Sequence, residues 1–277
     1  MAGSAGGSAT FGQEMSTEIH PTAIVEDGAE LGENVQVGAY AHIGSRARIG
    51  DNSIIMPKAM VIGRSLLGNG VEIHPGAVIG GTPQVLGFKA SDESWLEIGD
   101  RTVLREHTTV HTGSPAHGGV TKIGQDCLCM AHTHFAHDCD IGDNCVIANN
   151  THIGGHVVAG DNVWMGGAVA VHQFCRIGEH AFVGGGSILV ADVIPFGSVV
   201  GNHAHLAGLN IIGLKRRGFS RQAIRDLRAG YRLLYAREGT FTERLEDTAR
   251  AFSEVSEVML IVDFIRNSKN RSLCLPR

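Results

Sequence analysis

The residues best suited to chemistry are concentrated in one short run, 131–140, with the sequence AHTHFAHDCD. The run contains His132, His134 and His137, and Asp138 directly follows the last of them. An imidazole near neutral pH accepts a proton, and a neighbouring carboxylate orients the ring and stabilises its charged form. The pair of His137 and Asp138 therefore predicts a general base.

A repeat of six residues predicts the elements that position this pair. From Ile19 to Ile79, and again from Ile123 to Leu189, an apolar residue returns at every sixth position, and a small residue usually follows it by four. This period fits neither an α-helix nor the alternation of a simple strand. It is the hexapeptide pattern of a parallel β-helix, in which about three hexads close one triangular coil of about 18 residues. We therefore predict an all-β parallel β-helix.

Residues 18 positions apart lie above one another in such a solenoid, on strands about 4.8 Å apart. By this rule Gly155 lies over His137, and His156 lies over Asp138. A glycine N–H that no Cβ shields can stabilise the oxyanion of a tetrahedral intermediate. The stacking therefore predicts acyl transfer, with His137 as the base and Gly155 as the oxyanion donor.

The composition narrows the class of protein. The 38 glycines and 5% aromatic residues suit a Gly-rich solenoid, and 43% apolar residues argue against a disordered chain. The net charge of −5 does not indicate nucleic-acid binding, and no apolar run approaches the roughly 20 residues of a membrane span. The six cysteines form no CxxC pair and fit a small-residue core in a reducing compartment. We expect a cytoplasmic protein without a metal site.

The pattern divides the chain into successive segments. Where the six-residue phase breaks, loops should leave the solenoid on one face, which is often the binding face. The expected segments are a disordered leader (1–15), a β-helix (16–200) with loops at 81–97 and 112–122, a transition segment (201–219), and a small α-helical C-terminal domain (220–277).

Helical spacing begins after Ser220, and Thr240 with Glu243 predicts a capping box that opens the second of three helices. The open end of a β-helix is an unpaired edge that needs a cover, and the helical domain can supply one. The flat faces of a prism are natural contact surfaces. We therefore expect a homo-oligomer, with a trimer favoured by the triangular shape.

Three runs carry a resemblance to a known family: HFAHDC at 134–139, AVHQFC at 170–175 and GLKRRGF at 213–219. Together with smaller matches from Ile19 to the C-terminus, they resemble the bacterial UDP-N-acetylglucosamine O-acyltransferases, which perform the first step of lipid A biosynthesis. The resemblance implies a homotrimer of left-handed β-helices with active sites between subunits. It also implies acyl transfer from acyl carrier protein, which carries the chain on phosphopantetheine, with no other cofactor and no metal.

The resemblance further implies roles for individual residues. It makes His137 the base, Asp138 the carboxylate beside it and Gly155 the oxyanion donor. The implied substrate-binding residues are His134, His156, Gln173, Asn210, Arg216, Arg217, Gln84 and Lys89. The implied residues of the acyl-chain channel are Phe182, Gly185 and His203.

The first loop departs from the family pattern. After Pro-Gln the family carries an aspartate and, two residues later, a lysine, but this chain has Val85 and Gly87. Lys89 is expected to replace the missing lysine. A family glutamate near the nucleotide is Ile212 here. These changes keep open a different acceptor, a 3-amino analogue of the sugar nucleotide.

Other classes of protein also remain open from the residues alone. A coenzyme-A-dependent acetyltransferase shares the solenoid but lacks the helical tail. A structural solenoid would favour regular threonine arrays rather than histidine-rich corners. A metalloenzyme like a γ-class carbonic anhydrase would need three histidines that converge across a subunit interface, and His132 and His137 are candidate ligands. Otherwise His132 and His152 are expected to be ordinary surface histidines.

Overall fold

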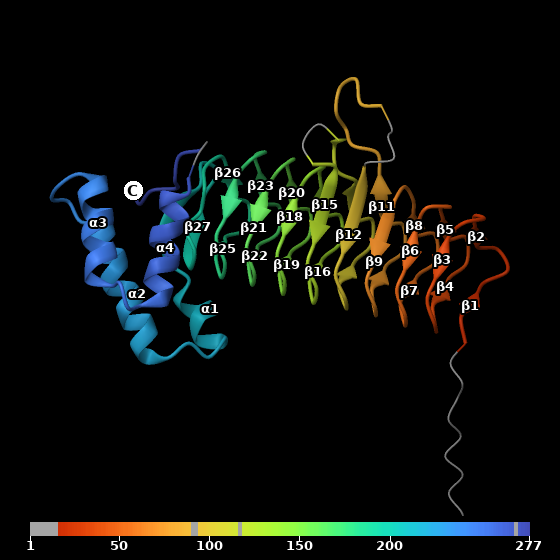
Figure 1. The fold of residues 1–277 in the computed structure, drawn as a ribbon, viewed down its shortest axis with the longest axis horizontal. Helices are drawn as coiled ribbons and strands as arrows, with labels where there is room; N and C mark the ends of the chain where they lie inside the picture. The colour runs from red at the N-terminus through yellow and green to blue at the C-terminus, as the bar shows by residue number, and fades with distance from the viewer. Residues whose placement is uncertain (1–15, 90–93, 116–117, 269–270) are drawn as a thin grey trace, which may run out of the picture.

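The computed structural model describes residues 16–89, 94–115, 118–268 and 271–277. The described chain is a long prism of short strands with a group of helices at one end (Figure 1). The predicted leader, residues 1–15, lies outside the described residues. None of the described helices is both long enough and apolar enough to span a bilayer.

Three sheets form the faces of the prism, and successive strands belong to successive sheets. Sheet A contains β1 (Glu18–Ile19), β4 (Gln36–Val37), β7 (Ile54–Ile55), β10 (Glu72–Ile73), β13 (Val103–Leu104), β16 (Leu128–Cys129), β19 (Val146–Ile147), β22 (Trp164–Met165), β25 (Phe182–Val183), β27 (Gly197–Val200) and β28 (His205–Leu209). Sheet B contains β2 (Ile24–Val25), β5 (His42–Ile43), β8 (Met60–Val61), β11 (Val78–Gly81), β14 (Thr109–His111), β17 (His134–Phe135), β20 (His152–Ile153), β23 (Ala170–Val171) and β26 (Ile188–Leu189). Sheet C contains β3 (Glu30–Leu31), β6 (Arg48–Ile49), β9 (Ser65–Leu67), β12 (Trp95–Ile98), β15 (Val120–Ile123), β18 (Asp140–Ile141), β21 (Val158–Ala159) and β24 (Arg176–Ile177).

The strand pairs have the predicted 18-residue register. His134 pairs with His152, and Phe135 pairs with Ile153, in parallel neighbouring strands. The second residue of the hexad strand points inward, so Phe135 is fully buried, and the small residue Cys139 fills the next inward position. The hexapeptide β-helix predicted from the sequence is therefore confirmed, and its core is a stack of equivalent apolar side chains.

Many corners of the prism need a left-handed backbone, which most side chains disfavour. At the corner that follows sheet B, these positions are taken by Asp138 (φ 59°), His156 (φ 59°) and Phe174 (φ 65°), one in each of three successive coils. Because the register stacks equivalent corners, these three side chains form a column along one edge of the prism. The edge is the corner between sheets B and C.

Two loops interrupt the register. The first leaves between β11 and β12, so Val78 pairs with Thr109, 31 residues later. The second leaves between β14 and β15, so Thr109 pairs with His134, 25 residues later. Both loops rise from the same edge of the prism (Figure 1).

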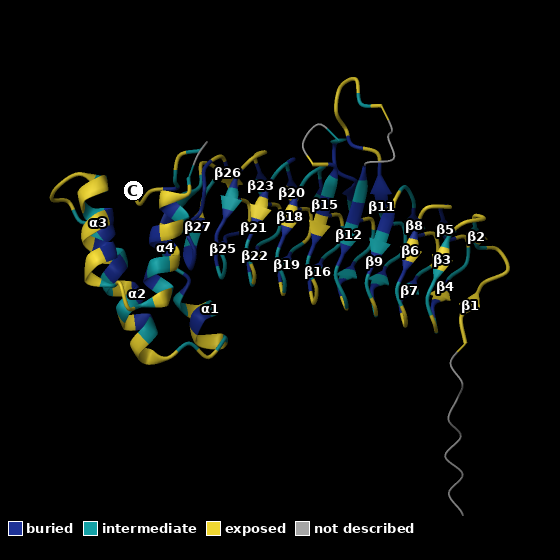
Figure 2. Cartoon of the chain, viewed as in Figure 1, coloured by how far each residue is buried: buried dark blue, intermediate teal, exposed yellow. Residues whose placement is uncertain are grey.

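The helices follow the last coils. They are α1 (Ile211–Arg216), α2 (Arg221–Leu234), α3 (Phe241–Ala251) and α4 (Ser256–Arg266). The predicted capping box is present, because Thr240 and Glu243 exchange hydrogen bonds at the start of α3. The short helix α1 and the antiparallel strand β28 were not predicted. Buried faces of α2 to α4 pack together, and exposed residues cover their outer sides (Figure 2).

A buried ion pair attaches the helices to the prism. Asp192 is 1% exposed and accepts hydrogen bonds from the backbone N–H and Nε of Arg176. The same guanidinium donates to the carbonyl oxygen of Phe264 in α4 and lies over its ring. Arg176 therefore ties the last coil of sheet C to α4.

Candidate active site

The predicted base and its carboxylate are in contact at the corner between β17 and β18. Nδ1 of His137 lies 2.7 Å from Oδ2 of Asp138. Because a carboxylate only accepts, the neutral ring carries its hydrogen on Nδ1, which leaves the lone pair of Nε2 available. His137 is therefore set up to accept a proton at Nε2.

The other side of the ring faces Gly155 in the next coil. A Cβ built on Gly155 would lie 2.9 Å from Nε2 of His137 and 2.8 Å from its Cε1. Within the described part of the chain, the N–H of Gly155 donates no backbone hydrogen bond. The predicted stacking is present: Gly155 lies against the basic nitrogen with no side chain between them, and its N–H is not used by another backbone group of the described chain.

Asp138 is held on both of its oxygens. Oδ1 accepts from the backbone N–H of Ser114 at 2.9 Å, and Nε2 of His156 lies 3.7 Å from Oδ2. The ring of His156 is stacked on Phe174 and lies edge-on to His137. The Asp138 side chain is only 4% exposed, so protein groups rather than solvent set its orientation.

His134 lies on the outward face of sheet B, in strand β17, which leads into the His137 corner. Its Nδ1 is 2.8 Å from Oγ1 of Thr109. Burial, together with the neighbouring His111 and His152, lowers the pKa of His134 to about 4. Burial and the proximity of His137 also lower the pKa of His111. Both rings are therefore neutral at physiological pH and can act as hydrogen-bonding groups of a substrate cleft.

The lowered pKa values predict a loss of stability in acid. The unfolded chain binds protons on these histidines at their ordinary pKa near 6.5, whereas folded His134 does so only near pH 4. Above about pH 6.5 these histidines are neutral in both states and cost the folded protein nothing. As the pH falls from 6.5 towards 4, the unfolded chain binds protons that the folded chain does not, so the free energy of unfolding decreases. Denaturant titrations at pH 7.5 and pH 5 should show a lower free energy of unfolding at pH 5. The loss should be smaller in His134→Asn, and an equal loss in that variant would contradict the assignment.

The nucleotide-end residues from the sequence analysis lie elsewhere on the chain. Asn210, Arg216 and Arg217 line a cavity of about 780 Å³ beside sheet A, together with Ile212 and Phe182. Phe182 was expected in the acyl-chain channel, and its neighbours here are the nucleotide-end residues. Sheet A is the face opposite the His137 corner, so a single chain does not bring Arg216 and Arg217 to the base.

Two of these cavity residues are also engaged within the chain. The amide of Asn210 accepts from the N–H of Gly213, as the N-cap of α1, and donates to the carbonyl oxygen of His180. Arg217 donates to the carbonyl oxygen of Asn162, and burial lowers the pKa of its guanidinium. Arg216 has no such bond within the described chain, which leaves it the guanidinium best placed to meet an anion.

The remaining predicted residues lie on exposed parts of the described chain. Gln84 and Lys89 belong to the first loop, Gln173 follows β23, and Gly185 and His203 lie near the last coils. A Cβ on Gly185 would have its nearest contact at 3.2 Å, the carbonyl oxygen of Gly167. Among the described residues, no hydrogen bond or ion pair joins any of these five to His137.

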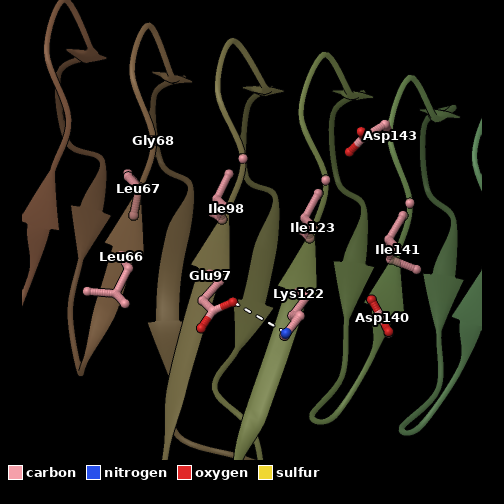
Figure 3. Close-up of a pocket in the computed structure, with 13 residues that line it drawn as sticks. Leu66, Leu67, Gly68, Glu97, Ile98, Lys122, Ile123, Asp140, Ile141 and Asp143 are labelled. Atoms are coloured by element: carbon pink, nitrogen blue, oxygen red, sulfur yellow. Dashed lines mark ion pairs between the residues drawn. The ribbon is translucent and has the colours of Figure 1, made fainter.

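Sheet C carries none of the predicted site residues. Its outward face has a shallow depression lined by charged side chains that include Glu97, Lys122 and Asp140 (Figure 3). Nζ of Lys122 lies 3.6 Å from a carboxylate oxygen of Glu97. Lys122 and Glu97 compensate each other, whereas Asp140 and Asp143 leave the depression with a net negative charge.

Some residues that contact the dyad or its neighbours were missed from the sequence, among them Ser114, Thr109 and His111. His111 is 8% exposed, its Nδ1 has no hydrogen-bond partner in the described chain, and its ring lies edge-on to His134. All three precede or belong to the second loop, where the 18-residue rule fails. The 25-residue spacing that the loop creates was the missing information.

Comparisons with known proteins agree with this architecture. The family described as bacterial transferase hexapeptide (six repeats) matches residues 46–81 and 121–155. The family described as UDP N-acetylglucosamine O-acyltransferase, domain 2, matches residues 192–274, which include the helices. The two matches cover separate parts of the chain, the solenoid and its tail.

Two curated relatives that match almost the whole chain carry the same name. The acyl-[acyl-carrier-protein]–UDP-N-acetylglucosamine O-acyltransferase of Caulobacter vibrioides is 50% identical over 93% of this chain and 98% of its own length. That of Bartonella henselae is 44% identical over 94% and 95%. The solved structure of the enzyme from Acinetobacter baumannii superposes with a TM-score of 0.88 at 36% identity, over 92% of this chain and 99% of that one. The chain therefore belongs to the UDP-N-acetylglucosamine O-acyltransferase family, and its solenoid is a left-handed parallel β-helix.

Proposed function

We propose that this protein transfers a 3-hydroxyacyl chain from acyl carrier protein to the 3-hydroxyl of UDP-N-acetylglucosamine, the first step of lipid A biosynthesis, in the cytoplasm. One observation carries the proposal: His137 is bonded through Nδ1 to Asp138, while its Nε2 lies 2.9 Å from the point where a Cβ on Gly155 would stand. Base, orienting carboxylate and oxyanion donor are the parts that acyl transfer to a hydroxyl requires.

The chemistry follows from these positions. Nε2 of His137 accepts the proton of the sugar hydroxyl as its oxygen attacks the thioester carbonyl carbon. The N–H of Gly155 stabilises the oxyanion of the tetrahedral intermediate. When the intermediate collapses, the carbon–sulfur bond breaks and the imidazolium returns its proton to the phosphopantetheine sulfur. Asp138 stabilises the imidazolium that forms between these two steps.

A homotrimer is part of the proposal. The outward face of sheet A carries a run of apolar side chains, whereas sheet C is charged. The apolar run comprises Val103, Leu128, Val146, Trp164 and Phe182, and Glu72 separates it from Ile54. Packing this face against a neighbouring chain would bury the run and bring the cavity of Arg216 and Arg217 towards a neighbour's His137. Light scattering is expected to give three chain masses, and a monomer with full activity would contradict the shared site.

Product mass spectrometry tests the reaction directly. The protein would receive acyl carrier proteins charged with a range of 3-hydroxyacyl chains and either UDP-N-acetylglucosamine or its 3-amino analogue. An ester on the 3-oxygen, cleaved by mild base, is the expected product. Absence of product from both acceptors would overturn the proposal.

The 3-amino sugar is the second candidate acceptor. Val85 and Gly87 stand in the first loop where the family carries an aspartate and a lysine, and Val85 is exposed. Ile212 is 67% exposed and lines the same cavity as Arg216 and Arg217. The family carries a glutamate at this position. An amide product, stable to mild base and formed only from the amino analogue, would favour this candidate.

A chelator should leave the activity intact. Donor atoms of His137, Asp138 and His156 lie within 4.8 Å of one another, a group able to hold a metal ion. The proposed proton transfer at Nε2 depends on the hydrogen bond between Nδ1 of His137 and the Asp138 carboxylate, and a metal ion bound to these side chains would disrupt it. Activity should therefore survive EDTA, and added Zn²⁺ should inhibit reversibly. Loss of activity in EDTA that Zn²⁺ restores would instead show that the reaction needs a metal.

A further inference from the structure

The two loops that leave the prism are joined by one buried hydroxyl group, that of Ser94. Its Oγ lies 2.6 Å from the carbonyl oxygen of Gly113 and 2.7 Å from Oγ1 of Thr112, and Ser94 is 6% exposed. A hydroxyl has a single hydrogen, and a carbonyl oxygen can only accept. Ser94 therefore donates to Gly113, and the hydroxyl of Thr112 donates to Ser94.

The carbonyl that Ser94 holds belongs to the peptide group whose N–H holds the proposed catalytic carboxylate. That group joins Gly113 to Ser114, and the N–H of Ser114 donates to Oδ1 of Asp138 at 2.9 Å. Because a peptide group is planar, fixing the direction of its C=O also fixes the direction of its N–H. A hydrogen bond at one end also polarises the group and strengthens the bond at the other.

The surrounding contacts leave the N–H of Ser114 as a separate hold on the Asp138 carboxylate. The backbone N–H of Asp138 is held separately by Oγ1 of Thr121 at 2.8 Å. Its carboxylate is almost fully buried, so water cannot readily replace the Ser114 N–H. A Cβ on Gly113 would lie 2.0 Å from the nitrogen of Val120, so the loop is tightly closed at this point.

We propose that Ser94 is a positioning residue for the reaction. Its hydroxyl aims the N–H of Ser114 at Asp138, and Asp138 in turn orients His137. The first loop, which carries Gln84 and Lys89, is thereby coupled to the base through four successive hydrogen-bonded groups. The inference rests on the proposed role of His137 as the base.

The test compares Ser94→Ala with Ser65→Ala. Ser65 is a matched control, because it is fully buried on the neighbouring strand β9 and donates to the carbonyl oxygen of Ile62 at 2.7 Å, away from the dyad. Ser94→Ala should lower kcat about tenfold, the factor that one hydrogen bond of ordinary strength supports, and leave KM for the sugar nucleotide unchanged. It should also move the pH profile of kcat, and Ser94→Thr should restore both. Ser65→Ala should lower only thermal stability.

A second readout does not depend on catalysis. In amide NMR spectra of the whole protein, the Ser114 N–H proton should shift upfield in Ser94→Ala as its bond to Asp138 weakens. It should stay in place in Ser65→Ala. Equal kcat in the two alanine variants, or an unchanged Ser114 resonance, would overturn the positioning role. If the wild-type protein proved inactive on both sugars, the proposed function would fail, while the NMR comparison would still decide whether Ser94 controls the Ser114–Asp138 bond.

Discussion

Replacing His137 by alanine is expected to lower kcat for acyl transfer by about 10²- to 10⁴-fold, the range that a positioned general base contributes. This corresponds to about 3 to 5 kcal/mol of transition-state stabilisation. The side chain bonds to Asp138 through Nδ1 and presents Nε2 towards Gly155, and no other described imidazole has both contacts. Its loss removes the proton acceptor and leaves the oxyanion donor and the cavity of the arginines in place.

The measurement is steady-state product formation with saturating acceptor, with thermal unfolding to confirm that the variant folds. His42→Ala is a suitable control. His42 also lies on the outward face of sheet B, but it pairs with Glu26 in the N-terminal coils. The control should retain wild-type kcat. A His137→Ala protein within about threefold of wild type, which corresponds to no more than one weak hydrogen bond, would exclude this residue as the base.

The parts of this site that could be predicted from the sequence are those governed by the repeat. Once the hexads are in phase, hydrogen bonding between coils places His152 on His134 and Gly155 beside His137 with no freedom of register. The inward positions of Phe135 and Cys139 follow from the same phase. A local motif and a strict period were therefore enough to predict that His137 and Asp138 are neighbours and that Gly155 lies against His137; their catalytic roles stay a proposal.

The loops lie outside that rule, because their contacts depend on tertiary packing. Nothing periodic relates Ser94 to Gly113 or Ser114 to Asp138, and the number of inserted residues is visible only after the strands on both sides are paired. The helix α1 was missed for a different reason. It has only six residues, too few for an apolar period, and its start depends on the Asn210 side chain rather than on a hydrophobic face.

The column of corner residues shows how the two kinds of information meet. The spacing of 18 predicts that Asp138 and His156 are neighbours. It does not predict that the carboxylate of Asp138 bonds to His137, or that the ring of His156 stacks on Phe174. Side-chain direction at a left-handed corner is set by the loop above it, here through Ser114. Periodicity therefore identifies the members of the site, and the irregular loops determine how the site is oriented.

Gly155→Ala should lower kcat by about 10²-fold or more, comparable to the loss of an oxyanion donor, although the N–H itself remains. The added Cβ would lie 2.9 Å from Nε2 of His137, closer than side-chain contacts allow. Either the ring turns away from Asp138, or the methyl group occupies the space that the attacking hydroxyl needs. Both outcomes separate the base from the reacting oxygen.

The same substitution should leave binding of the sugar nucleotide nearly unchanged, since the cavity of Arg216 and Arg217 lies beside sheet A. Calorimetric titration with the nucleotide, beside steady-state kinetics, separates the two effects. Gly167→Ala is the matched control. Its Cβ would meet a single atom, the carbonyl oxygen of Asn149 at 3.3 Å, which is farther than the 2.9 Å contact at Gly155. If Gly155→Ala weakened nucleotide binding and kept kcat, the space beside His137 would belong to recognition rather than to the reacting oxygen. A fall in kcat alone would place the chemical step between these two residues.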